Sequence, residues 1–183
     1  MRKINAWLFV TLDGVVEAPE NWVMPDDQMF GDQTKAYAAS DALLLGRRTY
    51  EVFAGSWPER GSDVPNADWM NNTQKYVASK SLTSPKWQNT TVLDGDVRDA
   101  VRRLKQEDGK NIVVNGSATL VRSLLDWGLL DELRLYLHPL VRGLGDKLFD
   151  DVKNGTPLGL ADTRTYANGV VSVAYEAKIS SIS

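Results

Sequence analysis

The chain has 183 residues, enough for one domain with a single hydrophobic core. Its net charge of −3 argues against a general binder of nucleic acid or of anionic membranes, since either needs a basic surface. With no cysteine and one histidine, His138, the chain has no disulfide framework, thiol nucleophile or iron–sulfur ligands, and we expect no metal site. No apolar run approaches a membrane span and the amino terminus lacks a signal-peptide pattern, so we expect a cytoplasmic protein.

The first part of the chain alternates strands, a long irregular segment and helices. Residues 4–12 are rich in β-branched and aromatic side chains, which predicts a central strand that ends at the turn signal Asp13-Gly14. Residues 15–27 show no period, and loops this long inside compact domains are often functional. The expected elements that follow are a helix over 27–40, a strand over 42–45, a helix over 47–54 and an irregular excursion over 55–72.

The second part repeats the alternation and then ends in strands. Asp94 or Asp96 is the expected cap of a helix whose apolar residues recur at helical spacing as far as Asp108-Gly109. Ser117 is a good N-cap for a further helix that stops at Gly128. The expected strands are 76–79, 90–93, 111–117, 129–137, 158–165 and 170–179, and residues 180–183 are expected to fray.

Strands that alternate with helices imply right-handed βαβ crossovers and a mostly parallel sheet with helices on both faces. The final run of strands without helices adds an antiparallel edge. The chain contains no linker or low-complexity tract. The sequence therefore predicts one α/β domain over residues 1–183, a three-layer, doubly wound, mostly parallel sheet with an antiparallel carboxyl-terminal edge.

The segment around Gly46 joins an apolar strand to a helix that begins with Arg47 and Arg48. A glycine lets another backbone approach closely, and a helix start offers unpaired N–H groups and a partial positive charge. With the Thr49 hydroxyl, these features suit a phosphate group. The alternative is a packed strand followed by a solvated helix that carries arginines.

A second strand–glycine–helix corner lies at Gly116. Ligands of open α/β sheets bind beyond the carboxyl ends of parallel strands, so both corners are expected to line one crevice that suits a pyrophosphate. Neither corner has a G-x-G-x-x-G fingerprint or a P-loop lysine motif. Ser79 and Lys80 follow a third strand and add a hydroxyl and a cation, which suit a further phosphate such as the 2′-phosphate of NADPH.

Four segments, spread over nearly the whole chain, have the sequence and the order of a known protein family: Thr11-Leu12-Asp13-Gly14, Leu44-Leu45-Gly46-Arg47-Arg48-Thr49-Tyr50-Glu51, Val77-Ala78-Ser79-Lys80, and residues 112–120. Residues 135–139 and 143–149 continue the pattern. Together they resemble the dihydrofolate reductase-like superfamily, and most closely the branch similar to the reductase domain of riboflavin biosynthesis, the RibD C-terminal domain.

The resemblance implies an NADPH-dependent reductase of a small heterocyclic substrate, similar to 5-amino-6-(5-phosphoribosylamino)uracil reductase or to dihydrofolate reductase. It places NADPH across the sheet, with Ser79 and Lys80 beside the adenosine and its 2′-phosphate. The chain departs from classical dihydrofolate reductases at Gly116-Ser117, where those enzymes usually have paired glycines. The remaining cofactor-binding residues implied are Gly46, Arg47, Arg48, Thr49, Asn115, Gly116, Ser117, Ala118, Thr119 and Leu120.

The resemblance also suggests where the substrate binds. The loop after Asp13-Gly14 is expected to close over the nicotinamide and the substrate, and Asp27 lies near the position of the carboxylate that anchors a pterin in classical enzymes. The expected proton source is Asp27 or a water molecule ordered by Asp13. The indoles of Trp22 and Trp57 are candidates to stack on a flat substrate. The structural alternatives are a turn role for Asp13, a helix N-cap for Asp27 and plain packing for Trp57.

Two other classes of function stay open at this point. One is a flavin- or nucleotide-binding module of the same fold without turnover, and the other is a structural protein that reuses the fold. The zinc signature of the deaminase that accompanies the riboflavin reductase cannot exist without cysteine, which argues against a housekeeping role in that pathway. Because the carboxyl-terminal strands offer an exposed edge and proteins of this branch are commonly dimeric, we expect a homodimer.

Overall fold

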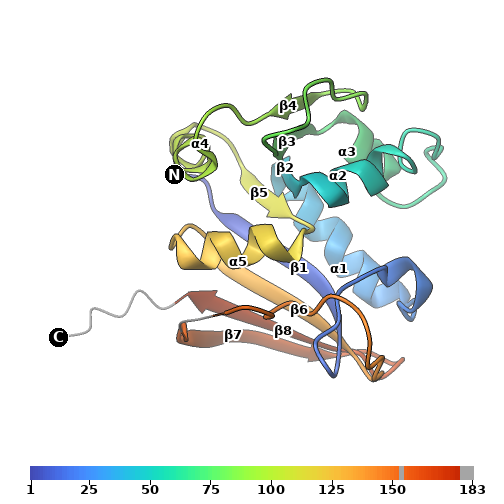
Figure 1. The fold of residues 1–183 in the computed structure, drawn as a ribbon. Coiled ribbons are helices and arrows are strands. Elements are labelled where there is room, and N and C mark those ends of the chain that lie inside the picture. Colours follow the sequence, from blue (N-terminus) through green and yellow to red (C-terminus); the bar gives the residue numbers. More distant parts are fainter. Residues whose placement is uncertain (153–154, 178–183) are drawn as a thin grey trace.

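The computed structural model describes residues 1–152 and 155–177. Eight strands form one sheet in the order β4-β3-β2-β5-β1-β6-β8-β7 (Figure 1). The neighbours from β4 to β6 pair in parallel, whereas β8 runs antiparallel to both β6 and β7. This confirms the predicted mostly parallel sheet with an antiparallel carboxyl-terminal edge. The strands are β1 (Ile4–Thr11), β2 (Ser40–Gly46), β3 (Gln74–Ala78), β4 (Thr90–Val92), β5 (Asn111–Val114), β6 (Glu132–His138), β7 (Leu158–Thr165) and β8 (Val171–Ala177).

Helices cover both faces of the sheet, so the domain has three layers. In Figure 1, α5 passes in front of the sheet and α1 lies behind it. Buried side chains of α1, α2 and α3 join one apolar cluster, and those of α4 and α5 join the other. The helices are α1 (Asp27–Ala38), α2 (Arg47–Ala54), α3 (Ala67–Asn72), α4 (Val97–Gln106) and α5 (Ala118–Asp126), with a 3₁₀ turn at Pro19–Asn21.

The central strands are apolar on both sides because both sides are covered. In β1, Ile4 and Ala6 pack in the cluster beneath α5, while Trp7 packs in the cluster beneath α1. The four residues Ala42 to Leu45 of β2 are all fully buried. Such continuous burial is the usual reason that strands of parallel sheets lack the polar–apolar alternation of half-exposed strands.

The helix starts differ in how their free N–H groups are satisfied. The side chains of Asp26, Asp96 and Ser117 accept hydrogen bonds from the first turns of α1, α4 and α5, at 2.9, 3.0 and 3.3 Å. The N-cap of α1 is thus Asp26 rather than Asp27. In contrast, α2 begins at Gly46 without any side-chain cap. Its first N–H groups therefore remain available to another acceptor.

One segment differs from the sequence-based expectation, since the excursion over 55–72 contains α3, whose six residues are too few to show a helical period. Beside it, Lys75 is fully buried, and its Nζ donates to the carbonyls of Met70, Asn71 and Thr73 at 2.9, 3.1 and 2.7 Å. The predicted fraying of residues 180–183 lies outside the described part of the chain. No helix in residues 1–152 or 155–177 is both long and apolar enough to cross a membrane.

Candidate functional site

The two glycine corners meet directly at the carboxyl ends of β2 and β5. The backbone N–H of Gly46 donates to the carbonyl oxygen of Gly116 at 3.1 Å. A Cβ atom on Gly46 would lie 2.3 Å from Ser117 Oγ, and one on Gly116, whose φ is +120°, would lie 2.9 Å from Thr49 Oγ1. Any larger residue at either position would push the two corners apart. The close approach therefore explains both glycines.

A cavity of about 420 Å³ opens beside this contact. Its walls come from the start of α2, the start of α5 and the loop after β6. Helix starts carry a partial positive charge, and α2 has no side-chain cap, so an anion in this cavity would meet unpaired N–H groups. The lining residues are Arg48, Ser117, Ala118, Thr119, Arg122, Asp146, Lys147, Asp150 and Asp151.

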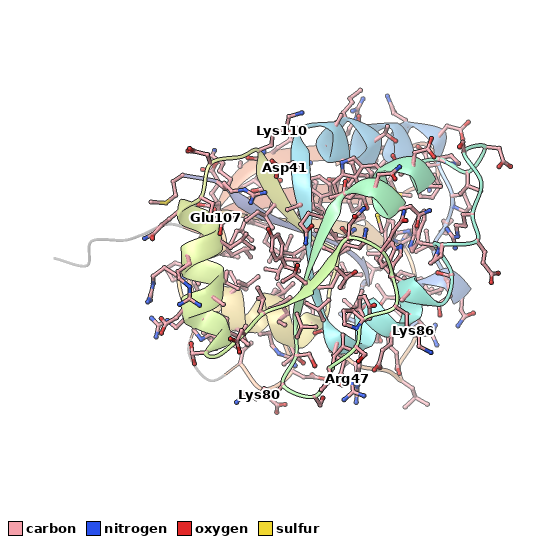
Figure 2. All side chains as sticks on the ribbon, turned by 90° about the horizontal axis from the view of Figure 1, so that it is seen from above. Asp41, Arg47, Lys80, Lys86, Glu107 and Lys110 are labelled. Carbon is pink, nitrogen blue, oxygen red and sulfur yellow. The ribbon has the colours of Figure 1, made fainter. Side chains whose placement is uncertain are left out.

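Arg47 points from α2 toward the loop that follows β3. Its Nε donates to Glu51 at 2.7 Å and its Nη1 donates to Ser81 Oγ at 2.5 Å. Lys80 in the same loop is exposed, and Figure 2 shows Arg47 and Lys80 at one end of the molecule, opposite Asp41 and Lys110. Ser79 stabilises the loop, since its Oγ accepts from the backbone N–H groups of residues 81 and 82. Two cations and two hydroxyls thus lie at the start of α2 and on the loop after β3, outside the lining of the cavity.

Asn115 and Leu120 lie at the inner wall of the second corner. Asn115 Nδ2 donates to the Tyr37 hydroxyl at 3.0 Å, and its buried Oδ1 has no partner among the described residues. Leu120 is buried in the core beneath α5, and its N–H already donates to Ser117 Oγ. These two residues shape the corner, while Ser117, Ala118 and Thr119 face the cavity.

Asp13 holds two loops together at the same edge of the sheet. Its carboxylate accepts from the Thr11 hydroxyl at 2.6 Å and from the N–H groups of Arg142 and Gly143 at 3.1 and 2.7 Å. These donors, the Thr11 hydroxyl first, lower the pKa of Asp13 to about 2. Asp13 is therefore ionised at neutral pH and connects the loop after β1 to the loop after β6.

Arg122 fixes the loop after β6 against α5, a role that the sequence analysis did not assign. Its Nη1 donates to the carbonyls of Lys147 and Leu148 at 3.1 and 3.0 Å. Asp146 on the same loop lies 3.4 Å from Arg48 across the cavity, with both side chains exposed. The glycine-rich run 143–149 was the only signal in the sequence that this loop belongs to the site.

Residues 2–172 match the family model of the RibD C-terminal domain. The chain belongs to this family. It is 34% identical over 182 residues to the uncharacterized protein YyaP of Bacillus subtilis (strain 168), covering 95% of this chain and 94% of YyaP. This confirms the resemblance inferred from the sequence, and it places the chain in a reductase-type family.

Two solved structures share the fold of this RibD C-terminal domain. A protein of Shewanella sp. PV-4 assigned to riboflavin biosynthesis superposes with a TM-score of 0.79 at 17% identity, over 97% of this chain and 99% of that one. Dihydrofolate reductase from Enterococcus faecalis, solved in complex with NADP(H), superposes with a TM-score of 0.61 at 17% identity, over 96% of each chain. Both structures confirm the predicted fold class.

The candidate proton source Asp27 lies apart from the interior of this RibD C-terminal domain. It is exposed at the first residue of α1, whereas the buried positions of that helix are Met29, Gln33 and Tyr37. No other carboxylate of α1 replaces it in the core, because Asp32 is bound to Lys35 and Arg164. Of the two candidates for the proton source, Asp13 and Asp27, only Asp13 contacts a loop that borders the cavity.

The two candidate substrate residues occupy different environments. Trp22 is almost buried, lies edge-on to the His138 ring at a centroid distance of 5.3 Å, and donates from Nε1 to the carbonyl of Glu17 at 2.8 Å. Trp57 is half-buried near the end of α2, where the Arg60 guanidinium lies 4.2 Å from its ring centre. The structure therefore brings only Trp22 to the end of β6 near the predicted substrate region.

His138 is fully buried at the end of β6. Its Nδ1 lies 2.9 Å from the carbonyl oxygen of Tyr136, so Nδ1 carries the proton, and Nε2 has no partner among the described residues. Burial lowers the pKa of His138, which keeps the imidazole neutral. Within residues 1–152 and 155–177, no group of three or more histidine or acidic side chains is arranged to hold a metal ion.

Proposed function

We propose that this protein is an NADPH-dependent reductase of a small planar heterocycle. The observation that carries the proposal is the contact between the Gly46 and Gly116 corners, which leaves the starts of α2 and α5 at one cavity. A pyrophosphate between them would accept hydrogen bonds from backbone N–H groups and lie in the field of two helix dipoles. Arg48, Arg122 and Lys147 would offset the carboxylates of Asp146, Asp150 and Asp151, which line the same cavity.

The surroundings of Arg47 support NADPH over NADH. Its guanidinium reaches the loop after β3, where it bonds to Ser81 and lies at the same end as Lys80. A 2′-phosphate on the adenosine ribose would bind this guanidinium and these neighbours through charge-assisted hydrogen bonds. NADH has no such phosphate, so the same residues would gain nothing from it.

When bound, NADPH supplies the hydride, and the protein supplies orientation and the exclusion of water. The Asp13 carboxylate and the N–H groups of Arg142 and Gly143 form what we call the Asp13 clamp, which joins the loop after β1 to the loop after β6. The loop after β6 lines the cavity. We assign proton delivery to a water molecule beside the ionised Asp13 rather than to Asp27, because Asp27 is exposed on α1. Trp22 and the neutral His138 pack against each other at the end of β6, and we propose that a flat, uncharged ring binds beside this pair.

The test is calorimetric titration of NADPH and of NADH into the wild-type protein, Arg47→Ala and the control Arg103→Ala. Arg103 is exposed in the last turn of α4. We expect Arg47→Ala to weaken NADPH binding by about 10- to 100-fold, since a charge-assisted hydrogen bond contributes about 1.5–3 kcal/mol. NADH affinity should change by less than about twofold, and Arg103→Ala should match the wild type. Equal losses for both cofactors would contradict the phosphate assignment.

Turnover separates a reductase from a binding module of the same fold. NADPH oxidation in the presence of pterins, aminopyrimidinediones or flavins should be faster than in their absence for at least one class. Tight NADPH binding without oxidation by any of them would favour the binding module.

We also propose that a second copy covers the edge strand β7, where Leu160 is 61% exposed. Sedimentation of a monomer at working concentration would refute the dimer.

A further inference from the structure

The loops at the carboxyl ends of the parallel strands differ in charge along the sheet. The loop after β3, residues 79–89, carries Lys80 and Lys86 and no acid, and Figure 2 shows both lysines in the lower part of the molecule with Arg47. In the sheet, β2 and β5 separate β3 from β1. Residues 13–27, which follow β1, contain five acids and no lysine or arginine: Asp13, Glu17, Glu20, Asp26 and Asp27. Cations and acids therefore lie on opposite sides of the two glycine corners.

The five acids after β1 are not neutralised by partners. None of them forms an ion pair within residues 1–152 and 155–177. Glu17, Glu20 and Asp27 are exposed. Asp13 accepts only from a hydroxyl and from backbone N–H groups, which stabilise its charge without cancelling it. Unpaired like charges on one segment give this side of the molecule a negative potential.

The loop after β6, which is joined to the loop after β1, does not reverse the sign. Residues 139–152 contain the cations Arg142 and Lys147 and the acids Asp146, Asp150 and Asp151. Together the two loops hold eight acids and two cations. In contrast, the loop after β3 has only cations. One edge of the sheet thus has a positive part near β3 and a negative part near β1 and β6.

The proposed orientation of NADPH puts the substrate on the negative part. The 2′-phosphate is assigned to Arg47 beside the loop after β3, and the pyrophosphate to the starts of α2 and α5. Because the strand order is β3-β2-β5-β1-β6, an extended dinucleotide has its nicotinamide near β1 and β6. A ring that accepts hydride must contact the nicotinamide. The substrate therefore binds beside Trp22 and the acids of residues 13–27.

We propose that the substrate is a heterocycle whose substituents are neutral or cationic, and that heterocycles carrying a phosphate are excluded. This inference rests on the proposed reductase function and names the class of substrate that the same site accepts. A phosphate adds about 1.5–2 negative charges, which the unpaired acids repel both on approach and in the bound state. An ammonium group is attracted by the same acids. The substrate 5-amino-6-(5-phosphoribosylamino)uracil belongs to the excluded class.

The test is calorimetric titration of three pterins that differ in one substituent: 6-(aminomethyl)pterin, 6-(hydroxymethyl)pterin and the phosphate ester of the latter. The protein is first saturated with 1,4,5,6-tetrahydro-NADP, whose nicotinamide ring is neutral and donates no hydride. At low ionic strength we expect affinity to fall in the order given, with the phosphate ester at least about tenfold weaker than the aminomethyl compound. This ratio should shrink to within about threefold at about 0.5 M salt, because exposed charges are screened.

A double variant localises the effect on the loop after β1. Glu17→Gln with Glu20→Gln removes two charges and retains side chains of the same size. We expect it to narrow the ratio between the aminomethyl compound and the phosphate ester by at least about threefold, and to change the affinity for the neutral hydroxymethyl compound by less than about twofold. The matched control, Glu107→Gln with Asp126→Asn, removes two exposed acids at the ends of α4 and α5, where the strands begin. It should leave the ratio unchanged.

The outcomes separate this inference from the proposed function. A phosphate ester that binds as tightly as the aminomethyl compound, absence of aminomethylpterin binding, or a ratio that Glu17→Gln with Glu20→Gln does not narrow would overturn the inference while cofactor binding stands. Equal narrowing in the control variant would also overturn it, since the acids after β1 would then have no special effect. Failure of tetrahydro-NADP to bind would overturn the proposed function and this inference with it.

Discussion

Replacing Gly46 with alanine tests the contact on which the cofactor crevice depends. The new Cβ atom would lie 2.3 Å from Ser117 Oγ, 3.0 Å from Ser117 Cβ and 3.1 Å from the Ser117 backbone nitrogen. Gly46 itself has a φ of −74°, which alanine adopts without strain. Any cost of Gly46→Ala must therefore come from pushing the two corners apart.

The expected cost follows from the atoms involved. Inserting a methyl group into a packed site usually destabilises a protein by about 1–3 kcal/mol, and we expect a value in this range for Gly46→Ala. Ser117→Gly alone should cost only a few tenths of a kcal/mol, since glycine is an acceptable N-cap. In the Ser117→Gly background the Oγ and Cβ obstacles are gone, so Gly46→Ala should become less costly by at least about 1 kcal/mol.

Urea unfolding of the wild type, both single variants and the double variant measures this coupling. Gly31→Ala is the matched control, because a Cβ atom there would meet nothing within 4 Å and α1 should gain about 0.5–1 kcal/mol. Additive costs in the double variant would refute the idea that Ser117 is the obstacle. A neutral Gly46→Ala would refute the close approach itself.

Three further substitutions test neighbouring contacts. Burial lowers the pKa of Lys75 from 10.5 to about 8, so between these pH values the unfolded chain binds more protons than the folded protein. The free energy of unfolding should therefore rise with pH across this window by up to about 3 kcal/mol in the wild type, and Lys75→Met should show no such rise in urea titrations. Identical pH profiles for the two proteins would contradict the lowered pKa of Lys75. Asp13→Asn leaves one acceptor oxygen where two carboxylate oxygens accept now, so backbone amide hydrogens of the loop over 139–148 should exchange faster with solvent. The exposed control Asp126→Asn should leave their exchange rates unchanged. Unchanged rates in Asp13→Asn would count against the clamp. Arg122→Ala removes the donors that hold the same loop against α5 and should weaken NADPH binding about tenfold; unchanged affinity would show that the loop is held by other contacts.

The parts of the site that the sequence predicted are those made by neighbours along the chain. A glycine, a helix start and two arginines follow one another at Gly46, and a similar corner recurs at Gly116. The βαβ connections then place both corners on the same edge of the sheet, which the hydrogen bond between them confirms. Local pattern and the handedness of crossovers were sufficient for this much.

The parts that it did not predict join residues far apart in the chain. Asp13 accepts from Arg142 and Gly143, about 130 positions away, and a single sequence carries no signal for such a pair. The assignment of α1 shows a second limit. Asp26 and Asp27 are adjacent acids at a helix start, and only the backbone conformation decides that the first is the cap and the second is exposed.

The sequence also did not predict which polar side chains are buried. A lysine in a short strand is ordinarily exposed, yet Lys75 is buried because the carbonyls at the end of α3 and the ring of Trp87, 4.4 Å from Nζ, surround its ammonium group. Because α3 itself was not predicted, its free carbonyls were not either. Trp7 and Asn5 likewise belong to an ordinary-looking strand, and their missing partners became evident only from the packing around them.

A crystal structure of the protein soaked with NADPH tests the central claim most directly. We expect the pyrophosphate between the starts of α2 and α5, the 2′-phosphate beside Arg47, and Arg48 turned from Asp146 toward the phosphates. The nicotinamide should then lie toward the Asp13 clamp. Cofactor density elsewhere on the protein, or an empty crevice at saturating NADPH, would contradict the assignment of the two glycine corners.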